Sequence, residues 1–423
     1  IVMLADGSWA PSSFSGVVSR QLSGTGAGLS SAACPAPGPE WWFVGAGSEI
    51  GRGSALLVSN PAEEPARFDI SLYSGAGPVQ ALAGKGIDLG PGATVRLRLD
   101  ALAPDEDLLA IEVGATSGRV SAAVRDVAVP VDGRARGVDF LPPAQIPNTR
   151  VVVAGIPDGG GRRDLVLVNP GAQFATVTPR LLTEDGPESL AELATIAVPA
   201  GAVIRVDLAR ILQGRAGSLD LASDVPVTGG VRAEWGETTR DIVWLAAVPL
   251  IGDPDPLGGA AAVPSGPGLT TTVVIAAPDG EVRGTLTTVT TQSPDAAALS
   301  GKPKPGIVPE ATQLVIPDGS PRTVTEQIVV PAGSQRTITV PTGATGAVAV
   351  DADADGKEGS GATPAGLVTL TWRSDPGSAP AALSHLVLDP TVPLATGYPW
   401  WPVVSSVTAV EVRADLGVLA PTG

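Results

Sequence analysis

The chain has 423 residues, which suits two to four domains of ordinary size. The 53 Gly and 41 Pro residues predict many turns. Because hydrophobic residues make up 43% of the chain, which is enough for folded cores, wholesale disorder is excluded. A formal net charge of −16 disfavours nucleic acid as a partner, and one His with one Cys excludes a His/Cys zinc site, an iron–sulfur cluster and an intrachain disulfide.

Short strands dominate the sequence pattern along the whole chain. Apolar and polar residues alternate in segments such as Ala93–Leu99, Val203–Leu208 and Arg336–Val340, and helical periodicity is scarce. Such alternation places one row of side chains in a core and the other row in water. Many short antiparallel strands predict sandwiches or barrels.

The strands recur in a fixed order. An apolar strand interrupted by Gly begins at Trp41 and again at Val151, and the next strand ends in Asn-Pro at Asn60 and at Asn169. A third, diverged copy begins at Thr272. Because Asn side chains close tight turns and the residue before proline avoids helix, Asn-Pro predicts a turn rather than a catalytic site.

We therefore predict an all-β protein of tandem antiparallel β-sandwich domains, with an immunoglobulin-like Greek key as the favoured topology. It has three repeats and two terminal half-repeats. The expected segments are N-terminal closing strands (1–38), repeat 1 (39–147), repeat 2 (148–262), repeat 3 with an inserted loop (263–397) and C-terminal strands (398–423). Because a half-sandwich leaves strand edges open, the two terminal segments should pack together or cap neighbouring repeats.

Several of these segments together resemble a known family. They are the run Cys34–Gly47 with its Glu-Trp-Trp-Phe core, the Leu-Val-x-Asn-Pro strand, the hairpin at 118–123 and the run Gly137–Pro142. Over residues 16–400 the chain is similar to an actinobacterial family known as domain of unknown function 5719. The resemblance implies an extracytoplasmic protein with an N-terminal anchor, often encoded beside a membrane glycosyltransferase. The family has no assigned catalytic residues, so the resemblance implies none here.

One acidic motif suggests a metal. Asp351, Asp353 and Asp355 stand at alternate positions before Gly356, a spacing that presents hard oxygen ligands to calcium in a tight loop. The calcium-loop pattern has Glu six residues after the Gly, where this chain has Ala362. Two interpretations stay open: a calcium site at the three aspartates, or a solvated acidic hairpin tip.

Catalytic patterns are weak. His385 follows Ser384 directly, and neighbouring residues of a strand point to opposite faces, so the two do not predict a nucleophile and its base. Many acidic residues are present, but nothing in the sequence singles out a carboxylate pair for glycoside hydrolysis. We therefore expect a protein that is not an enzyme.

The tryptophans are the remaining candidates for contact with a ligand or partner. The pairs Trp41-Trp42 and Trp400-Trp401 recur, each at the expected start of a repeat. In a strand one indole of each pair can fill the core while the other faces outward. An outward Trp can stack on a sugar, dock on a partner protein or pack against the next sandwich.

Composition and resemblance together lead to one expected function with two alternatives. We expect a non-enzymatic binding or scaffold protein of the actinobacterial cell envelope, with no cofactor unless calcium binds. The resemblance makes it an accessory subunit of a membrane glycosyltransferase, anchored by a segment that precedes this chain. The alternatives are a carbohydrate-binding module acting on envelope polysaccharide and a structural surface or stalk protein.

Overall fold

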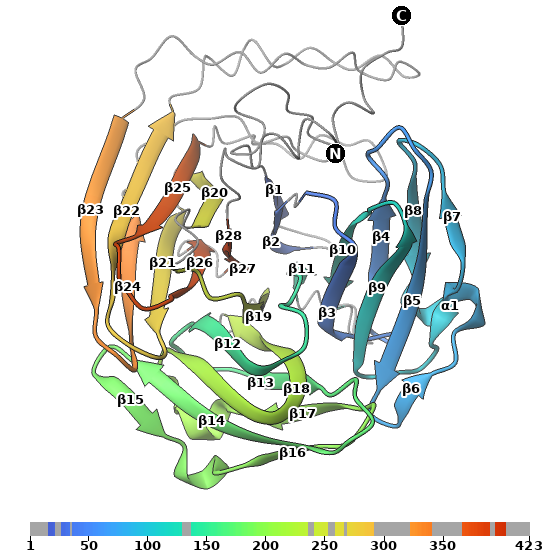
Figure 1. The fold of residues 1–423 in the computed structure, drawn as a ribbon, viewed down its shortest axis with the longest axis horizontal. Coiled ribbons are helices and arrows are strands. Elements are labelled where there is room, and N and C mark those ends of the chain that lie inside the picture. Colours follow the sequence, from blue (N-terminus) through green and yellow to red (C-terminus); the bar gives the residue numbers. More distant parts are fainter. Residues whose placement is uncertain are drawn as a thin grey trace, which may run out of the picture.

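The computed structural model describes residues 16–21, 27–33, 36–128, 137–235, 241–252, 259–265, 269–291, 322–340, 366–389 and 394–402. This part of the chain is mostly β, with several antiparallel sheets and only short helices. No helix in it is long and apolar enough to cross a membrane. Three repeats lie around a common centre, with repeat 1 in blue, repeat 2 in green and repeat 3 in yellow to red (Figure 1).

Repeat 1 contains two antiparallel sheets. The first-strand sheet, which holds the first strand of the repeat, has the order β3-β9-β5 with β6 and β7 also paired to β5. The last-strand sheet has the order β11-β10-β4-β8. The elements are β3 (Glu40–Ala46), β4 (Ala55–Ser59), β5 (Ala66–Ser74), β6 (Gly77–Val79), the 3-10 turn Leu82–Gly84, β7 (Ile87–Leu89), β8 (Thr94–Arg98), α1 (Leu99–Leu102), β9 (Leu109–Ser117), β10 (Ser121–Val127) and β11 (Val138–Leu141).

Repeat 2 follows the same order with one difference. Its strand β18 is 19 residues long and runs through both sheets, whereas repeat 1 breaks at Gly118, whose φ of 70° makes a tight turn between β9 and β10. The first half of β18 pairs with β12 and β14, and its second half pairs with β13 and β19. The elements are β12 (Asn148–Ile156), β13 (Arg163–Val168), β14 (Ala175–Thr183), β15 (Gly186–Ser189), the 3-10 turn Ala191–Leu193, β16 (Ile196–Val198), β17 (Val203–Asp207), α2 (Ala209–Leu212), β18 (Gly217–Trp235) and β19 (Asp241–Val248).

Repeat 3 again has two sheets, β28-β20-β25-β22-β23 and β24-β21-β26-β27. Thr272, the expected start of this repeat, lies in β21, which pairs with β24 and β26 as β4 pairs with β8 and β10. Its first strand is β20, and the boundary drawn at 263 falls inside that strand. The elements are β20 (Gly259–Ser265), β21 (Thr270–Ala277), β22 (Val282–Thr291), β23 (Arg322–Val330), β24 (Ser334–Val340), β25 (Gly366–Ser374), β26 (Ala382–Asp389), β27 (Leu394–Pro399) and β28 (Trp401–Pro402).

Alternating side chains fill a core between the two sheets of each repeat. In β5 every second residue from Ala66 to Ser74 is buried, which confirms the predicted half-buried strands. The core of repeat 1 also takes Ile242 and Trp244 from β19 of repeat 2. The same strand sends Val243 and Leu245 into the core of its own repeat. A last strand is therefore shared between two successive cores.

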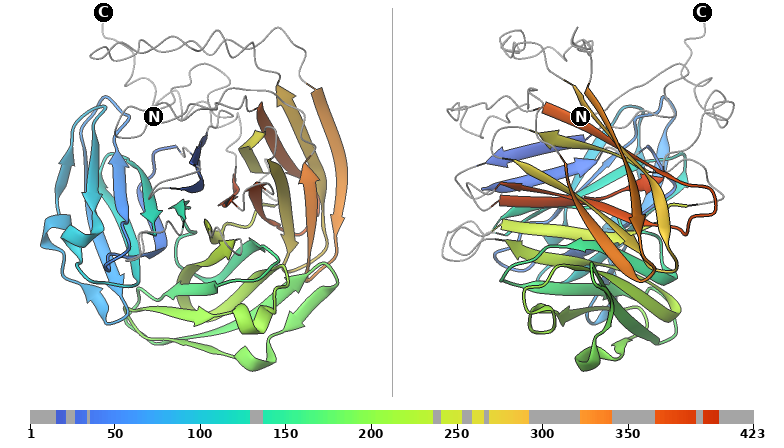
Figure 2. Two further views of the ribbon diagram at one scale, coloured as in Figure 1. Left: turned by 180° about the vertical axis from the view of Figure 1, so that it is seen from behind. Right: turned by 90° about the vertical axis from the view of Figure 1, so that its left-hand side faces the viewer.

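Successive repeats also pack sheet against sheet. The far face of the first-strand sheet of repeat 1 carries Trp42 and Val44, which pack on Val166 and Val168 of repeat 2. Val152 and Ala154 of repeat 2 pack in the same way on Ala276 and Ala382 of repeat 3. Figure 2 shows that the inner strands run along the axis around which the repeats stand.

Four strands meet at the centre. They are the last strands of the three repeats, β11, β19 and β27, and the N-terminal strand β2 (Gly28–Ala33), which pairs with β1 (Gly16–Gln21). Strand β2 lies beside β11 and β27, and β19 lies beside the same two strands, so the four close a ring. The N-terminal segment thus packs on β27, which starts at Leu394 and completes repeat 3. Residues 403–423 of the expected C-terminal segment lie outside the described residues, so the predicted packing of the two terminal segments stays a prediction.

Candidate functional site

The paired tryptophans are buried. Trp41 is 8% exposed, lies in the core of repeat 1 and donates its indole N–H to the Val120 carbonyl at 2.7 Å. Trp42 is 3% exposed and stacks on Tyr73, with ring centroids 5.7 Å apart. Trp41 thus fills the core of its own repeat, and Trp42 points out of that core on the far face of the sheet, which repeat 2 covers. Of the three roles open to an outward Trp, Trp42 takes the last, packing against the next repeat.

The second tryptophan pair lies near the one histidine. Trp400 is fully buried and donates its indole N–H to His385 Nδ1 at 3.2 Å. Burial lowers the pKa of His385 to about 3, so its ring is neutral and accepts this hydrogen bond. Ser384 Oγ instead donates to the Ala154 carbonyl of repeat 2, at 2.9 Å, so Ser384 and His385 do serve separate contacts. Trp401 lies in β28, and its side chain is outside the described residues.

The expected calcium ligands Asp351, Asp353 and Asp355 also lie outside the described residues. Within the part that is described, no group of three His, Cys, Asp or Glu side chains is placed to hold a metal ion. The aspartates that do come together lie elsewhere, at the centre of the ring.

Asp241 ties the four central strands to one another. Its Oδ2 accepts the backbone N–H of Leu29 at 2.8 Å and of Ala395 at 3.1 Å. Its Oδ1 accepts the N–H of Ile242 at 3.0 Å and of Val138 at 3.4 Å. These donors belong to β2, β27, β19 and β11. The edge of each central strand that faces the middle of the ring has backbone N–H groups that are not paired with another strand. The buried carboxyl group of Asp241 accepts hydrogen bonds from N–H groups that would otherwise lack an acceptor.

Asp139 does the same from β11. It accepts N–H groups from Ser31 at 3.3 Å, from Phe140 at 2.9 Å and from Trp244 at 3.3 Å. Thr396 Oγ1 donates to it at 2.9 Å, and the Ser31 hydroxyl lies 2.8 Å from the same Thr396 oxygen. Ser31 of β2 and Thr396 of β27 are therefore linked through the carboxylate of repeat 1.

Both central carboxyls hold protons more tightly than a free aspartate. Burial raises the pKa of Asp241 to about 7, although four backbone N–H groups favour its charged form. Burial also raises the pKa of Asp139, and the neighbouring Asp241 charge raises it further. The centre of the ring therefore holds two buried carboxyl groups whose titrations influence each other.

A third buried carboxylate, that of Asp126, joins repeat 1 to repeat 2. Asp126 accepts hydrogen bonds from Arg52 at 2.9 and 3.0 Å, from Ser54 at 2.6 Å and from the Trp244 indole at 3.3 Å. The guanidinium of Arg52 also lies over the Trp244 ring, 5.6 Å from its centroid. Burial alone would raise the pKa of Asp126, but the charge and hydrogen bonds of Arg52 lower it. Gly45, with φ of 115°, leaves room for the indole.

At the rim of each joint between repeats, a glycine lies against a proline and an arginine contacts the neighbouring repeat. The turn glycines Gly201 and Gly333 each have positive φ and lie against a proline of the preceding repeat, Pro78 and Pro187. Charges add to these contacts: Arg205 of repeat 2 pairs with Asp107 of repeat 1 at 3.5 Å. At the next joint, an equivalent role falls to Arg180, which donates to the Pro278 carbonyl at 2.6 Å.

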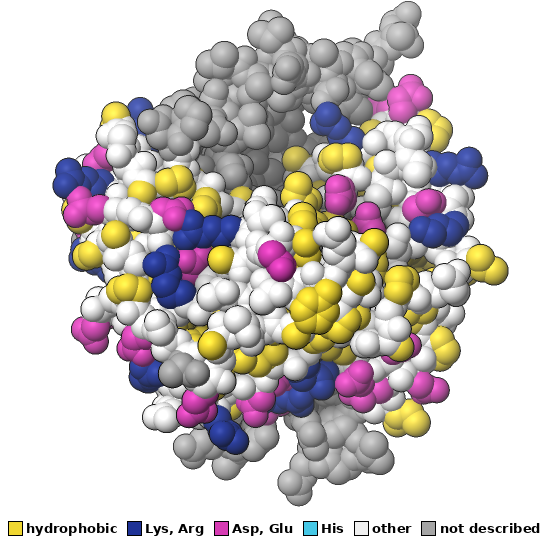
Figure 3. All heavy atoms as spheres, turned by 60° about the horizontal axis from the view of Figure 1, so that its bottom comes forward, with side chains coloured by type: hydrophobic (Ala, Val, Ile, Leu, Met, Phe, Trp, Pro, Cys, Tyr) yellow, Lys and Arg dark blue, Asp and Glu magenta, His cyan; other side chains and the backbone are white. Residues whose placement is uncertain are grey.

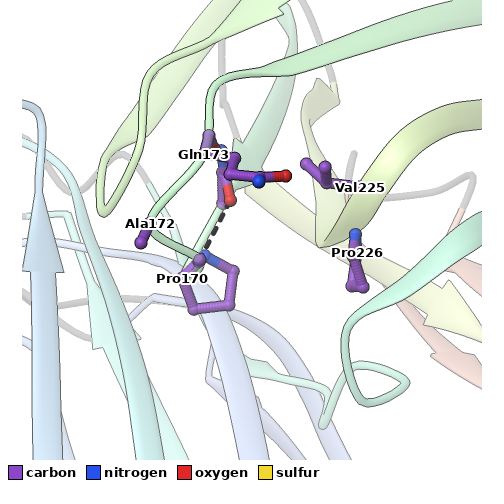
Figure 4. A pocket seen from close by; sticks show the side chains of 7 residues that line it. Pro170, Ala172, Gln173, Val225 and Pro226 are labelled. Carbon is purple, nitrogen blue, oxygen red and sulfur yellow. Dashed lines mark hydrogen bonds between the residues drawn. The ribbon is translucent and has the colours of Figure 1, made fainter.

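One shallow recess lies on the surface of repeat 2. Pro170, Ala172, Gln173, Val225 and Pro226 line it (Figure 4). Its floor is fixed by Asn169, whose side chain donates to the Gln173 carbonyl at 2.7 Å and to the Val198 carbonyl at 3.1 Å. Beside this loop Phe174 is 54% exposed. On the face with repeat 2 turned forward, hydrophobic side chains gather near the middle and charged ones lie around them (Figure 3).

The central aspartates were not among the residues singled out from the sequence. Asp139 lies in Gly137–Pro142, a run noted only for its family resemblance, and Asp241 opens an otherwise apolar run of eight residues. A lone acid within a strand that is buried on both faces was the available signal, because such a charge needs partners.

These features define a β-rich protein of repeated two-sheet units locked around a buried centre. A family model described as a family of unknown function, DUF5719, matches residues 1–300. The chain belongs to this family, as its sequence motifs indicated. No curated protein matches the chain.

Proposed function

We propose that this protein is a non-enzymatic binding or scaffold protein of the cell envelope, an accessory subunit of a membrane glycosyltransferase. The observation that carries the proposal is that the buried acidic and histidine side chains form their hydrogen bonds within the chain. The buried acids Asp126, Asp139 and Asp241 hold repeats together through hydrogen bonds within the chain, and the neutral His385 accepts a hydrogen bond from Trp400 inside repeat 3. A protein built in this way recognises a partner by shape and surface chemistry.

The joints support a scaffold in particular. Shared last strands, buried carboxylates and glycine–proline contacts fix each repeat against the next. A rigid arrangement of surfaces loses little conformational entropy when a partner binds, which favours affinity. The extracytoplasmic location, the anchor and the glycosyltransferase remain inferences from the family resemblance.

A second candidate function is binding of envelope polysaccharide. The recess on repeat 2 favours it, because the Gln173 amide faces a small apolar surface formed by Pro170, Val225 and Pro226 (Figure 4). The exposed ring of Phe174 lies next to that loop and offers a face for stacking on a sugar. The test compares Phe174→Ala with the wild type on a polysaccharide array, and Leu82→Ala is an equally apolar control on repeat 1. Loss of binding in Phe174→Ala alone would support this candidate, and unchanged binding would reject it.

We also propose an immunoglobulin-like topology for each repeat, with the first strand and the strand before the last exchanged between the two sheets. In an immunoglobulin domain strand B pairs with E, and C pairs with F. The equivalent pairs here are β4 with β8 and β5 with β9. The first strand β3 then takes the place beside β9, and β10 takes the place beside β4. An experimental structure in which β4, β5, β8 and β9 do not superpose on strands B, C, E and F of an immunoglobulin domain would overturn this proposal.

The main proposal is tested by purifying the full-length protein from native membranes in mild detergent and identifying what accompanies it by mass spectrometry. We expect a membrane glycosyltransferase in near-equal amount. Recovery of the protein by itself would reject the accessory-subunit role. Purification of the glycosyltransferase from the same membranes, tagged instead of this protein, is the reciprocal control.

A further inference from the structure

The ring has four central strands but three complete repeats among the described residues. β2 pairs with β1 as β11 pairs with β10, β19 with β18 and β27 with β26. In the three repeats, the strand before the last has a second neighbour, namely β4, β13 or β21. Within the described ranges β1 pairs with β2 alone. The outer part of a fourth sandwich is therefore not supplied by these residues.

The place that the outer part of a fourth sandwich would occupy borders the outer face of the last-strand sheet of repeat 1. In repeat 2 the same face carries Val166, Val168 and Val203, which are buried against the first-strand sheet of repeat 1. Strand register shows the correspondence: Val166 pairs with Arg205 on β17, and Leu57 pairs with Arg96 on β8. In repeat 1, however, Leu57, Ser59 and Ala123 are partly exposed and Thr94 and Arg96 are exposed.

Arg96 lacks the acid that its counterpart has. Arg205 forms a salt bridge with Asp107 of the preceding repeat at 3.5 Å and donates to the Asp107 carbonyl at 3.3 Å. No carboxylate in the described part of the chain forms a salt bridge with Arg96, although Arg98 on the same strand pairs with Asp100. The first repeat therefore presents a cation where the next joint holds an ion pair.

The turn before β8 is open in the same way. Gly92 has φ of 63°, like Gly201 with 67° and Gly333 with 73°. Gly201 and Gly333 are buried beneath Pro78 and Pro187, whereas Gly92 is exposed and no atom lies within 4 Å of the position of a Cβ. Three features of a joint are thus present on repeat 1, and the described residues do not supply the half that these features contact elsewhere.

We propose that the outer face of the sheet β11-β10-β4-β8 binds an antiparallel β-sheet of a partner protein, which brings a carboxylate to Arg96 and a proline-bearing turn to Gly92. The occupant is a protein sheet because the same face receives one at both joints inside this chain. The proposal rests on the proposed function, since it places the accessory-subunit contact on repeat 1. It adds the location and the chemistry of that contact.

Charge reversal at Arg96 tests the proposal in the full-length protein. Arg96→Glu and the control Arg210→Glu, whose side chain is 86% exposed on α2 of repeat 2, are purified from native membranes beside the wild type. We expect recovery of the glycosyltransferase to fall about tenfold with Arg96→Glu, because an attractive pair becomes a repulsive one. Arg210→Glu should retain wild-type recovery. Thermal melting checks that both variants fold.

A photo-crosslinking residue at Thr94 supplies a second readout that does not depend on a stability change. We expect its crosslink in an acidic, strand-forming segment of the co-purified enzyme. If the enzyme co-purifies but Arg96→Glu retains it, or if Thr94 crosslinks only to this chain or a second copy, the docking face is wrong and the accessory role stands. If the wild type recovers no enzyme, the accessory role and this docking proposal both fall.

Discussion

Replacing Asp241 by asparagine should change how the stability of the protein depends on pH. Burial raises the pKa of Asp241 from 3.8 to about 7, so the folded protein keeps a proton that the unfolded chain releases between these values. The stability that this proton contributes is complete below the unfolded pKa and is lost as pH rises through the folded one. At about 1.4 kcal/mol per pKa unit, the loss is about 4 kcal/mol.

The Asp241→Asn variant has no such proton to lose. Urea unfolding followed by tryptophan fluorescence would give the free energy of unfolding of both proteins from about pH 4 to about pH 8. We expect the advantage of the wild type to shrink by about 4 kcal/mol over this range. Comparison of the two proteins cancels the contributions of titrating groups that do not interact with Asp241, including His385. It does not cancel that of Asp139, whose pKa the Asp241 charge raises.

Near the acidic end both side chains are neutral, yet the variant should be less stable there. Its amide NH2 replaces an oxygen that accepts two backbone N–H groups, for example those of Leu29 and Ala395. Each donor left without an acceptor costs about 1–3 kcal/mol. A wild-type advantage that stays constant or grows with rising pH would refute the argument that burial keeps this carboxyl protonated.

Three further predictions concern Trp244, Gly45 and His385. Trp244→Ala should cost about 3–5 kcal/mol and weaken hydrogen-exchange protection in repeats 1 and 2 together, since β19 serves both cores; a loss confined to repeat 2 would contradict this. Gly45→Ala should lower the melting temperature, because a Cβ there meets the Trp244 ring at positive φ, whereas Gly53→Ala has open space and should not. His385 has its pKa lowered to about 3, so acidification from about pH 6.5 to about pH 5 should lower the stability of the wild type by about 2 kcal/mol relative to His385→Asn, since Asp241 contributes equally to both proteins; equal slopes would argue against a buried neutral ring.

The repeating pattern of strands and turns could be predicted from local chemistry. Asn60 Oδ1 accepts the Ala62 N–H at 3.1 Å, and Asn169 Oδ1 accepts the Gly171 N–H at 3.0 Å, so both Asn-Pro sites are the predicted turns. Alternation likewise gave the buried rows correctly, as in β5. These features depend on neighbours in sequence, which is why pattern alone reveals them.

Alignment of the third repeat was wrong for a physical reason. A strand buried on both faces is uniformly apolar, so Thr272–Ala277 resembles a first strand as much as a second one. Only pairing with β24 and β26 distinguishes the two. For Trp42, alternation indicated the face that the indole takes, but it left open whether a sugar, a partner protein or the next repeat covers that face; in the structure it is the next repeat.

The central acids depend on contacts that no local pattern contains. Asp241 binds N–H groups of Leu29 and Ala395, which are 212 and 154 residues away along the chain. Asp139 and Thr396 are 257 residues apart. The sequence marks such a site only as an isolated acid in an apolar strand, and its partners become visible once the fold places β2 and β27 beside β19 and β11.

The shared last strand has a consequence for synthesis. The core of repeat 1 is incomplete until residues 242 and 244 have been made, more than a hundred residues after its own first strand. During elongation, therefore, repeat 1 exposes the space that Trp244 later fills, and the core of repeat 2 likewise lacks Ala395 of β27. Domains usually fold as units in the order of their synthesis. Here closure lags one repeat behind the growing chain, so a truncated nascent product would leave an open core at its end.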